Sequence, residues 1–205
     1  MSRYRSADER RAQLMDAGAE LFVAKGFAAT TLDDITRLAG VSKGLFYQYF
    51  PSKEGLVAAL QEKFAARFAA DLIAAAAACP DWPGKLDVAV LTCFRRLSGD
   101  SGLPGVLFRP VASGVPEARD PLAPGHQAAH RHLVEAIAAL LSAGVAAGAY
   151  QVDDVEATAL LFFTAMHAFV PLMRHDIGVP DDRLLRAAQH LVRGAAGVAG
   201  VAGRP

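Results

Sequence analysis

The chain has 205 residues, a formal net charge of zero and a hydrophobic content of 53%. This length can bury a substantial core, either as one domain or as a small domain joined to a larger one. The balanced charge argues against a protein that coats nucleic acid indiscriminately, so any nucleic-acid binding must come from a localised arrangement of residues. Cys79 and Cys93 have neither metal-ligand spacing nor a C-x-x-C pattern, which indicates a reduced, cytosolic setting.

The first residues are polar and basic, with no apolar segment behind them. We therefore expect no signal peptide and predict a cytoplasmic protein. Residues 136–152 and 157–173 are uncharged stretches of a length at the lower limit of a membrane span. Neither stretch has a clear flanking Lys/Arg cluster, so we interpret both as buried helices and expect no membrane partner.

The first predicted helix spans residues 7–25, and Gly26 can end it. A short second helix is predicted to follow Thr31, because Asp34 lies three positions further on, the spacing of a capping box. Gly40 can adopt the left-handed conformation that ends this helix. Ser42 can then cap a third helix. Two helices joined by a tight turn with Gly form a helix-turn-helix, whose second helix enters the major groove of DNA.

The third helix is predicted to have an apolar and a polar face. Phe46 and Phe50 are one turn apart and face the core, whereas Tyr47 and Gln48 stay on an outward face with Lys43. Hydroxyl, ammonium and backbone N–H groups at the start of such a helix can donate to phosphate. The residues that we predict to contact DNA are Thr31, Ser42, Lys43, Gly44, Leu45, Tyr47, Gln48, Tyr49 and Lys53.

Alternatives remain for three of these residues. Tyr47 and Tyr49 could be half-buried core aromatics, and Leu45 could either contact a thymine methyl group or pack against a neighbouring helix. Taken together, the motif is more specific than any of its members.

Residues 26–56, GFAATTLDDITRLAGVSKGLFYQYFPSKEGL, resemble the DNA-binding segment of the TetR/AcrR family of bacterial transcriptional repressors. The recognition helix of that family reads approximately S-K-G-x-[LF]-Y-x-[HY]-F, followed by a short break and a Lys. The matching positions here are Ser42, Lys43, Gly44, Phe46, Tyr47, Tyr49, Phe50 and Lys53. Leu45 departs from the pattern, since the family often has a small polar residue there.

A long helix is predicted after Lys53, with apolar residues every four positions from Leu56 to Leu72, and a Pro- and Gly-containing segment ends it near Cys79. Further helices are predicted at 85–97, 127–147, 153–175 and 181–196. Residues 98–125 are loop-rich, with a short apolar piece at 106–111. No segment alternates as a strand, so the predicted fold class is all-α. We expect a three-helix, helix-turn-helix DNA-binding domain at 1–52 and a larger helical effector-binding and dimerisation domain at 53–205.

The predicted helix at 153–175 has small residues on one side and large apolar residues on the other. A helix that is apolar on both sides is buried on both sides, so we expect one face to pack against a second subunit. Dimers of TetR-like proteins are also built through helices at this place. The residues of the predicted homodimer interface are Ala157, Leu161, Ala165, Ala168, Leu184, Ala188, Leu191 and Ala195. The alternative is an ordinary monomer core.

The resemblance also implies a small-molecule pocket in the second domain, for a lipophilic or aromatic effector. Such pockets combine aromatic walls with a few polar groups. The predicted lining residues are Phe64, Phe68, Phe94, Phe108, Phe163, Met166 and His167. Each of them could instead be plain core.

His126 and His130 share a helix face and are the main candidates for a metal site, but no acidic ligand, nucleophile elbow or phosphate loop accompanies them. We therefore expect no enzyme, no metal and no cofactor. The predicted function is a ligand-responsive repressor that binds a pseudo-palindromic operator as a homodimer and is released by a small molecule. The alternative is a constitutive DNA-binding regulator or activator without an effector.

Overall fold

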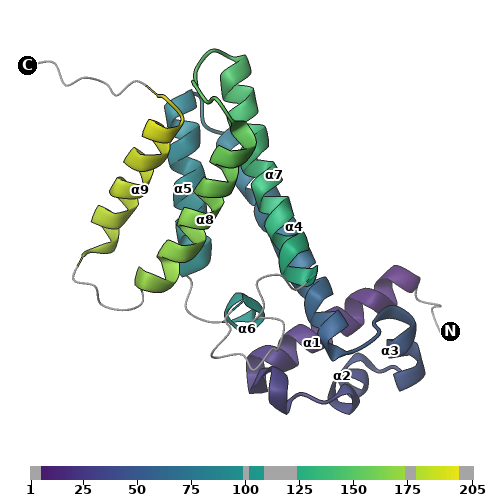
Figure 1. Ribbon diagram of the computed structural model, residues 1–205. Helices are drawn as coiled ribbons and strands as arrows, with labels where there is room; N and C mark the ends of the chain where they lie inside the picture. Colours follow the sequence, from purple (N-terminus) through teal and green to yellow (C-terminus); the bar gives the residue numbers. More distant parts are fainter. Residues whose placement is uncertain (1–5, 99–101, 109–123, 174–178, 199–205) are drawn as a thin grey trace, which may run out of the picture. The chain divides into compact units, whose positions relative to one another are not determined.

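The computed structural model describes residues 6–98, 102–108, 124–173 and 179–198, and within these ranges the regular structure is entirely α-helical (Figure 1). The helices are α1 (Ala7–Ala29), α2 (Leu32–Ala39), α3 (Lys43–Tyr49), α4 (Lys53–Ala77), α5 (Trp82–Ser98), α6 (Leu103–Phe108), α7 (Pro124–Ala146), α8 (Val155–Met173) and α9 (Asp181–Ala195). The predicted all-α class is confirmed.

Two helix boundaries differ from the prediction for identifiable reasons. Helical turns resume after Gly26, whose φ of 81° kinks the chain, so that α1 continues to Ala29. The second difference is the start of α5, which begins at Trp82, ahead of the predicted start at residue 85. A proline such as Pro83 is tolerated in the first turn of a helix. Part of the segment predicted as loop-rich forms the short helix α6.

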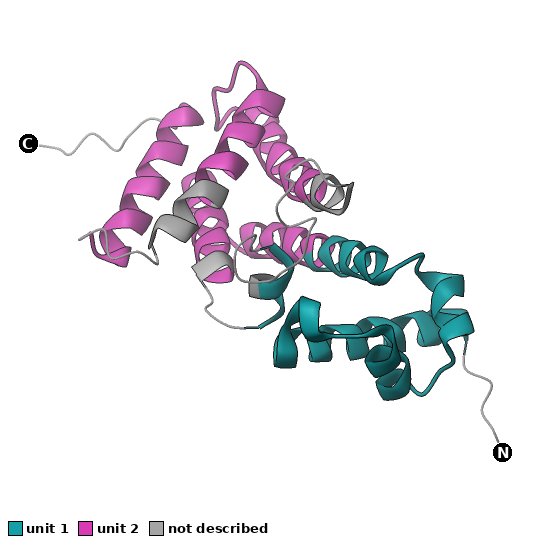
Figure 2. Ribbon diagram, turned by 60° about the horizontal axis from the view of Figure 1, so that its bottom comes forward, with its two compact units in different colours: residues 1–64, 100–129 teal, residues 65–99, 130–205 magenta. Residues whose placement is uncertain are grey.

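The chain forms two compact units (Figure 2). Unit 1 comprises residues 1–64 and 100–129, and unit 2 comprises residues 65–99 and 130–205. The dividing line falls within α4, after Phe64, whereas the domain boundary predicted from the sequence falls at the start of that helix. That predicted boundary stays a prediction.

Unit 1 is built around one apolar core to which α6 contributes. Its members include Leu14, Phe22, Ile35, Phe46, Leu56 and Leu107, all inaccessible to solvent. The fully buried Gln61 of α4 donates its Nε2–H to the carbonyl of Leu107, at 2.8 Å. A six-residue helix from far along the chain therefore completes the core around which the first three helices pack.

Unit 2 has α5 packed against both α8 and α9. Asp87 on α5 accepts hydrogen bonds from the Arg193 guanidinium of α9, the Nε donor at 2.7 Å. The Tyr150 hydroxyl donates to the carbonyl of Trp82 at 2.6 Å, and the two rings meet edge to face. Gly144 permits this contact, since a Cβ at that position would overlap the Tyr150 ring.

Candidate nucleic-acid interface

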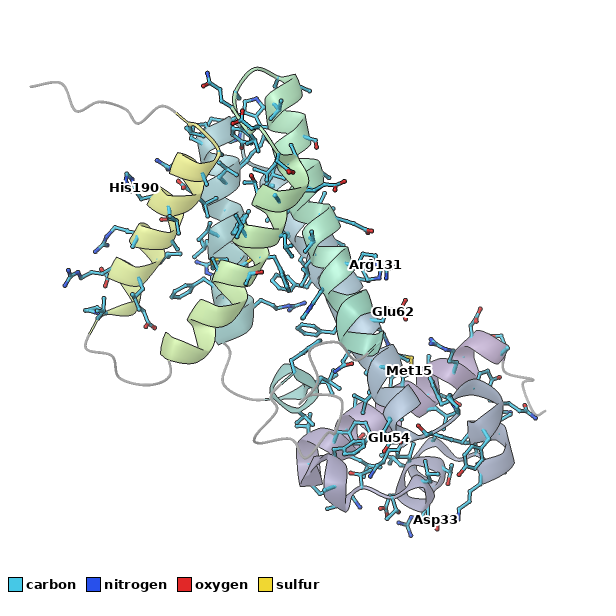
Figure 3. The ribbon with its side chains drawn as sticks, in the orientation of Figure 1. Met15, Asp33, Glu54, Glu62, Arg131 and His190 are labelled. Atoms are coloured by element: carbon cyan, nitrogen blue, oxygen red, sulfur yellow. The ribbon has the colours of Figure 1, made fainter. Side chains whose placement is uncertain are left out.

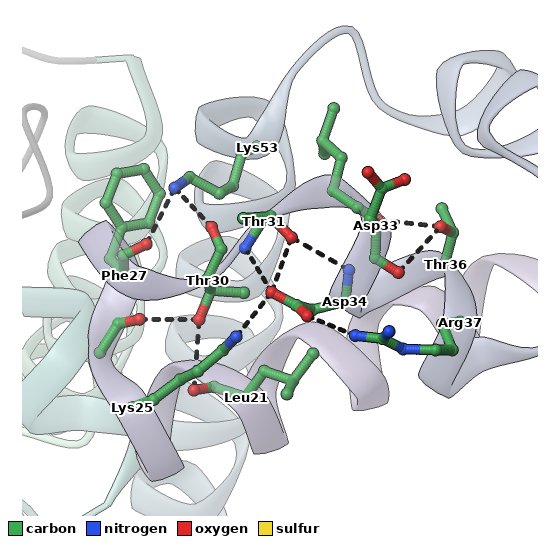
Figure 4. Close-up of polar contacts among 12 residues, drawn as sticks. Leu21, Lys25, Phe27, Thr30, Thr31, Asp33, Asp34, Thr36, Arg37 and Lys53 are labelled. Atoms are coloured by element: carbon green, nitrogen blue, oxygen red, sulfur yellow. Dashed lines mark hydrogen bonds and ion pairs between the residues drawn. The ribbon is translucent and has the colours of Figure 1, made fainter.

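The start of α2 is held by the predicted capping box, which is confirmed (Figure 4). The Thr31 hydroxyl accepts the N–H of Asp34 at 3.2 Å, and the Asp34 carboxylate accepts the N–H of Thr31 at 2.9 Å. The same carboxylate binds the ammonium of Lys25 and the guanidinium of Arg37, both at 2.6 Å. The hydrogen bond from Lys25, followed by that from the Thr31 side chain, holds the pKa of Asp34 well below its usual range.

The turn between α2 and α3 follows the predicted chemistry. Gly40 has a φ of 64° and a ψ of 37°, the left-handed conformation that favours glycine. The Ser42 hydroxyl accepts the N–H of Leu45 at 3.2 Å and so caps α3. These two residues fix the direction in which α3 leaves the turn.

The predicted faces of α3 are also confirmed. Phe46 is fully buried and Phe50 nearly so, with their ring centroids 5.6 Å apart. The opposite side is open to solvent, and the Tyr47 side chain is 54% exposed. The buried phenylalanines thus anchor one face of α3 in the core, and the opposite face of the helix presents polar groups to solvent.

The predicted DNA-contacting residues fall into two groups. The exposed ones are Thr31, Ser42, Lys43, Gly44, Tyr47 and Gln48. Leu45, Tyr49 and Lys53 are partly buried. Tyr49 packs against the core of unit 1, as the alternative for this residue anticipated. The DNA contacts themselves stay predictions.

Lys53 has a structural role that the sequence analysis missed. Its ammonium donates to the carbonyls of Phe27 and Thr30, both at 2.8 Å, and lies 4.0 Å from the centre of the Phe27 ring (Figure 4). Burial lowers the pKa of Lys53. The buried Thr30 hydroxyl donates to the carbonyl of Gly26 at 2.7 Å. Lys53 and Thr30 together donate to carbonyls at the kink and at the C-terminal end of α1.

A second unpredicted contact joins α2 to α3. The Lys43 ammonium lies 2.7 Å from the carboxylate of Asp33, and both side chains are more than half exposed. The hydrogen bond from Lys43 to Asp33 raises the pKa of the lysine. Asp33 stands at the outer edge of unit 1 (Figure 3). Sequence spacing gave no signal for this pair, because its partners lie on different helices.

The residues predicted to bind an effector are divided between the two units. Phe64 and Phe108 lie in unit 1 with ring centroids 5.6 Å apart. Unit 2 holds Phe68, Phe94, Phe163 and Met166. The side chains of His167 and His126 lie outside the described residues. The pocket stays a prediction. No group of three potential metal-ligating side chains occurs in the described part of the chain.

The residues predicted to form a dimer interface are mostly exposed on unit 2. Leu161 of α8 and Leu191 of α9 are 69% and 63% exposed. Ala157, Ala165 and Ala195 are exposed as well, and Ala188 is half-buried. Leu184 instead packs inside its own subunit, and the side chain of Ala168 lies outside the described residues.

The opposite, large-residue face of α8 is buried where it is described. Phe162, Phe163 and Met166 are each less than one-tenth exposed, as predicted. None of the helices in the described ranges is long and apolar enough to span a membrane.

Comparison with known proteins identifies the N-terminal segment. The sequence model of the family described as "Bacterial regulatory proteins, tetR family" matches residues 14–60, which run from α1 into α4. The chain is 36% identical over 94 residues to the transcriptional activator FasR of Mycolicibacterium smegmatis, covering 46% of this chain and 43% of that protein. It is 48% identical over 54 residues to the regulator TtgR of Pseudomonas putida, covering 26% of each chain. These matches span less than half of either relative.

Solved structures show the same fold over nearly the whole chain. FadR of Bacillus subtilis, solved in complex with stearoyl-CoA, has a TM-score of 0.66 at 20% identity and covers 90% of this chain and 98% of its own. RolR, solved with resorcinol, has a TM-score of 0.68 at 19% identity and covers 99% and 97%. Residues 14–60, with their helix-turn-helix geometry, thus match the segment that the tetR family model describes, and the chain shares the fold of these solved structures over nearly its whole length.

Proposed function

We propose that this protein is a cytoplasmic transcriptional regulator that binds a pseudo-palindromic operator as a homodimer and is released from it by a small molecule. The observation that carries the DNA-binding part is the exposed polar face of α3. Tyr47 and Gln48 project from a helix anchored by Phe46 and Phe50, on a helix-turn-helix fixed by two side-chain caps. Tyrosine hydroxyls suit phosphate contacts, and an amide can read the edge of an adenine.

Dimerisation is supported by the exposed apolar surface of unit 2. Leu160, Leu161 and Leu191 are each more than half exposed, on helices whose other faces are buried. Large apolar side chains gathered on a surface commonly mark a protein interface. A two-fold dimer would place one α3 in each of two half-sites, about 34 to 36 Å apart on the duplex. In this proposal residues 1–52 form the DNA-binding domain and residues 53–205 the effector and dimer domain.

The effector part is supported by the solved relatives. FadR of Bacillus subtilis was solved with an acyl-CoA and RolR with an aromatic diol. A lipophilic or aromatic effector is therefore proposed here. FasR of Mycolicibacterium smegmatis is an activator, which keeps activation as the second candidate function.

The test begins with selection of binding sites from random duplex DNA by the full chain, followed by affinity measurements on the selected site. Gln48→Ala should change the preferred base at one position of each half-site, by about 1 to 3 kcal/mol. Gln151→Ala makes the same chemical change at an exposed position of unit 2 and should leave the preference unaltered. Recovery of no enriched, two-fold symmetric site would refute the proposal. A thermal-shift screen of lipophilic and aromatic compounds, scored with operator release, tests the effector.

A further inference from the structure

We propose that Asp33 sets the affinity of this protein for DNA by holding the ammonium of Lys43, which must leave Asp33 before it can bind a phosphate. The inference rests on the proposed DNA-binding function. Asp33 would therefore weaken binding to duplex DNA of any sequence and leave discrimination to the side chains that reach base edges.

The proposed DNA-binding segment has a limited supply of cations. Residues 1–55 carry eight Lys and Arg against seven Asp and Glu, so this segment has almost no excess of positive charge. Residues 25–53 hold four cations, and each is engaged within the protein. Lys25 and Arg37 bind Asp34, and Lys53 binds two carbonyls. Lys43 binds Asp33 at 2.7 Å. A phosphate that binds the ammonium of Lys43 must therefore displace the carboxylate of Asp33.

The side chain of Asp33 has no part in the cap of α2. The capping box and its two ion pairs use Thr31 and Asp34. The Asp33 side chain is 67% exposed and reaches across to the first turn of α3. Exposed ion pairs of this kind contribute little to folding stability. Removal of the charge should thus leave the helix-turn-helix folded and release Lys43.

The pairing of Lys43 with Asp33 also affects how the affinity for DNA depends on salt. Each Lys or Arg that neutralises a phosphate releases condensed counterions and steepens the dependence of affinity on salt by about 0.9 in the double-logarithmic slope. A lysine already paired with a carboxylate contributes less than this, because the carboxylate takes up a cation when the pair opens. Low non-specific affinity matters physically, since bulk DNA offers a large excess of competing sites.

The experiment compares full-length wild type with Asp33→Asn by fluorescence anisotropy on two labelled duplexes, one random and one carrying the selected operator, between about 50 and 200 mM salt. Asp33→Asn should bind both duplexes more tightly, by up to about fivefold at about 50 mM salt, with a slope steeper by less than about 0.9. Asp16→Asn is the matched control, since Asp16 is an exposed aspartate of the same unit that also faces a lysine, Lys63 at 3.6 Å. It should leave both quantities unchanged.

Two further variants assign the effect to Lys43. Asp33→Glu keeps the charge and should retain wild-type affinity. In a Lys43→Ala background, Asp33→Asn should give no gain. The inference is overturned if Asp33→Asn, with an unchanged thermal unfolding midpoint, binds no more tightly than wild type, or if its gain persists without Lys43. If wild type itself binds neither duplex, the proposed function fails instead.

Discussion

Replacing Leu107 with Ala should destabilise the DNA-binding unit, although residue 107 lies far from the helix-turn-helix in sequence. Its side chain is fully buried in the core of unit 1, on a helix that packs against α1 and whose Leu107 carbonyl is bound by Gln61 of α4. Shortening a fully buried Leu to Ala removes apolar contacts and leaves a cavity, at a cost of about 2.7 to 5 kcal/mol. That cost is a large part of the roughly 5 to 15 kcal/mol that stabilise a typical domain.

The assay is urea unfolding followed by circular dichroism, with DNA affinity measured on the same samples. Leu38→Ala is the matched control, because Leu38 belongs to the same unit and is 47% exposed. It should cost less than about 1 kcal/mol. Equal unfolding midpoints for the two variants would show that α6 adds nothing to the core of unit 1.

Three other outcomes are expected. Lys53→Met should lower the free energy of unfolding by about 1 to 3 kcal/mol, because two carbonyls lose a charged donor. Lys63→Met, at an exposed lysine, is the control. Equal calorimetric midpoints for the two variants would exclude the structural role of Lys53. Asp34→Asn should lower the thermal midpoint at pH 7. Because the folded pKa of Asp34 is depressed, its contribution is present above about pH 4 and is lost as pH falls toward that lowered pKa, so the gap to wild type should narrow on acidification; a gap independent of pH would contradict this. Leu161→Asp should shift a sedimenting dimer to monomer, whereas Val23→Asp, at an exposed position of unit 1, should not; a wild-type protein that is already monomeric at micromolar concentration would show the interface to be wrong.

The features that the sequence predicted well depend on short-range spacing. The Thr31 capping box, the left-handed Gly40, the Ser42 cap and the two faces of α3 each follow from residues within one or two turns of each other. Local chemistry of this kind leaves few alternatives for the backbone.

The features that the sequence analysis missed join residues that are distant in the chain or on separate helices. Lys53 reaches back to Phe27, and Gln61 binds the carbonyl of Leu107. A lone lysine at a helix start fits equally well with a phosphate contact and with a carbonyl cap, so spacing cannot decide between them. Leu103–Phe108 is too short to be recognised as a helix, and its burial depends on the surface that α1 presents to it.

The place of α6 in the core of unit 1 also bears on how the protein is made. A ribosome releases the helix-turn-helix well before Leu107, which lies 46 residues after Gln61. At a synthesis rate of roughly 5 to 20 residues per second, the nascent chain waits about 2 to 9 s for the segment that covers its core. During that interval the apolar surface of α1 that receives α6 has no partner from its own chain. The family segment at residues 14–60 is thus fully synthesised before the chain contains α6, the helix that completes the core of its unit.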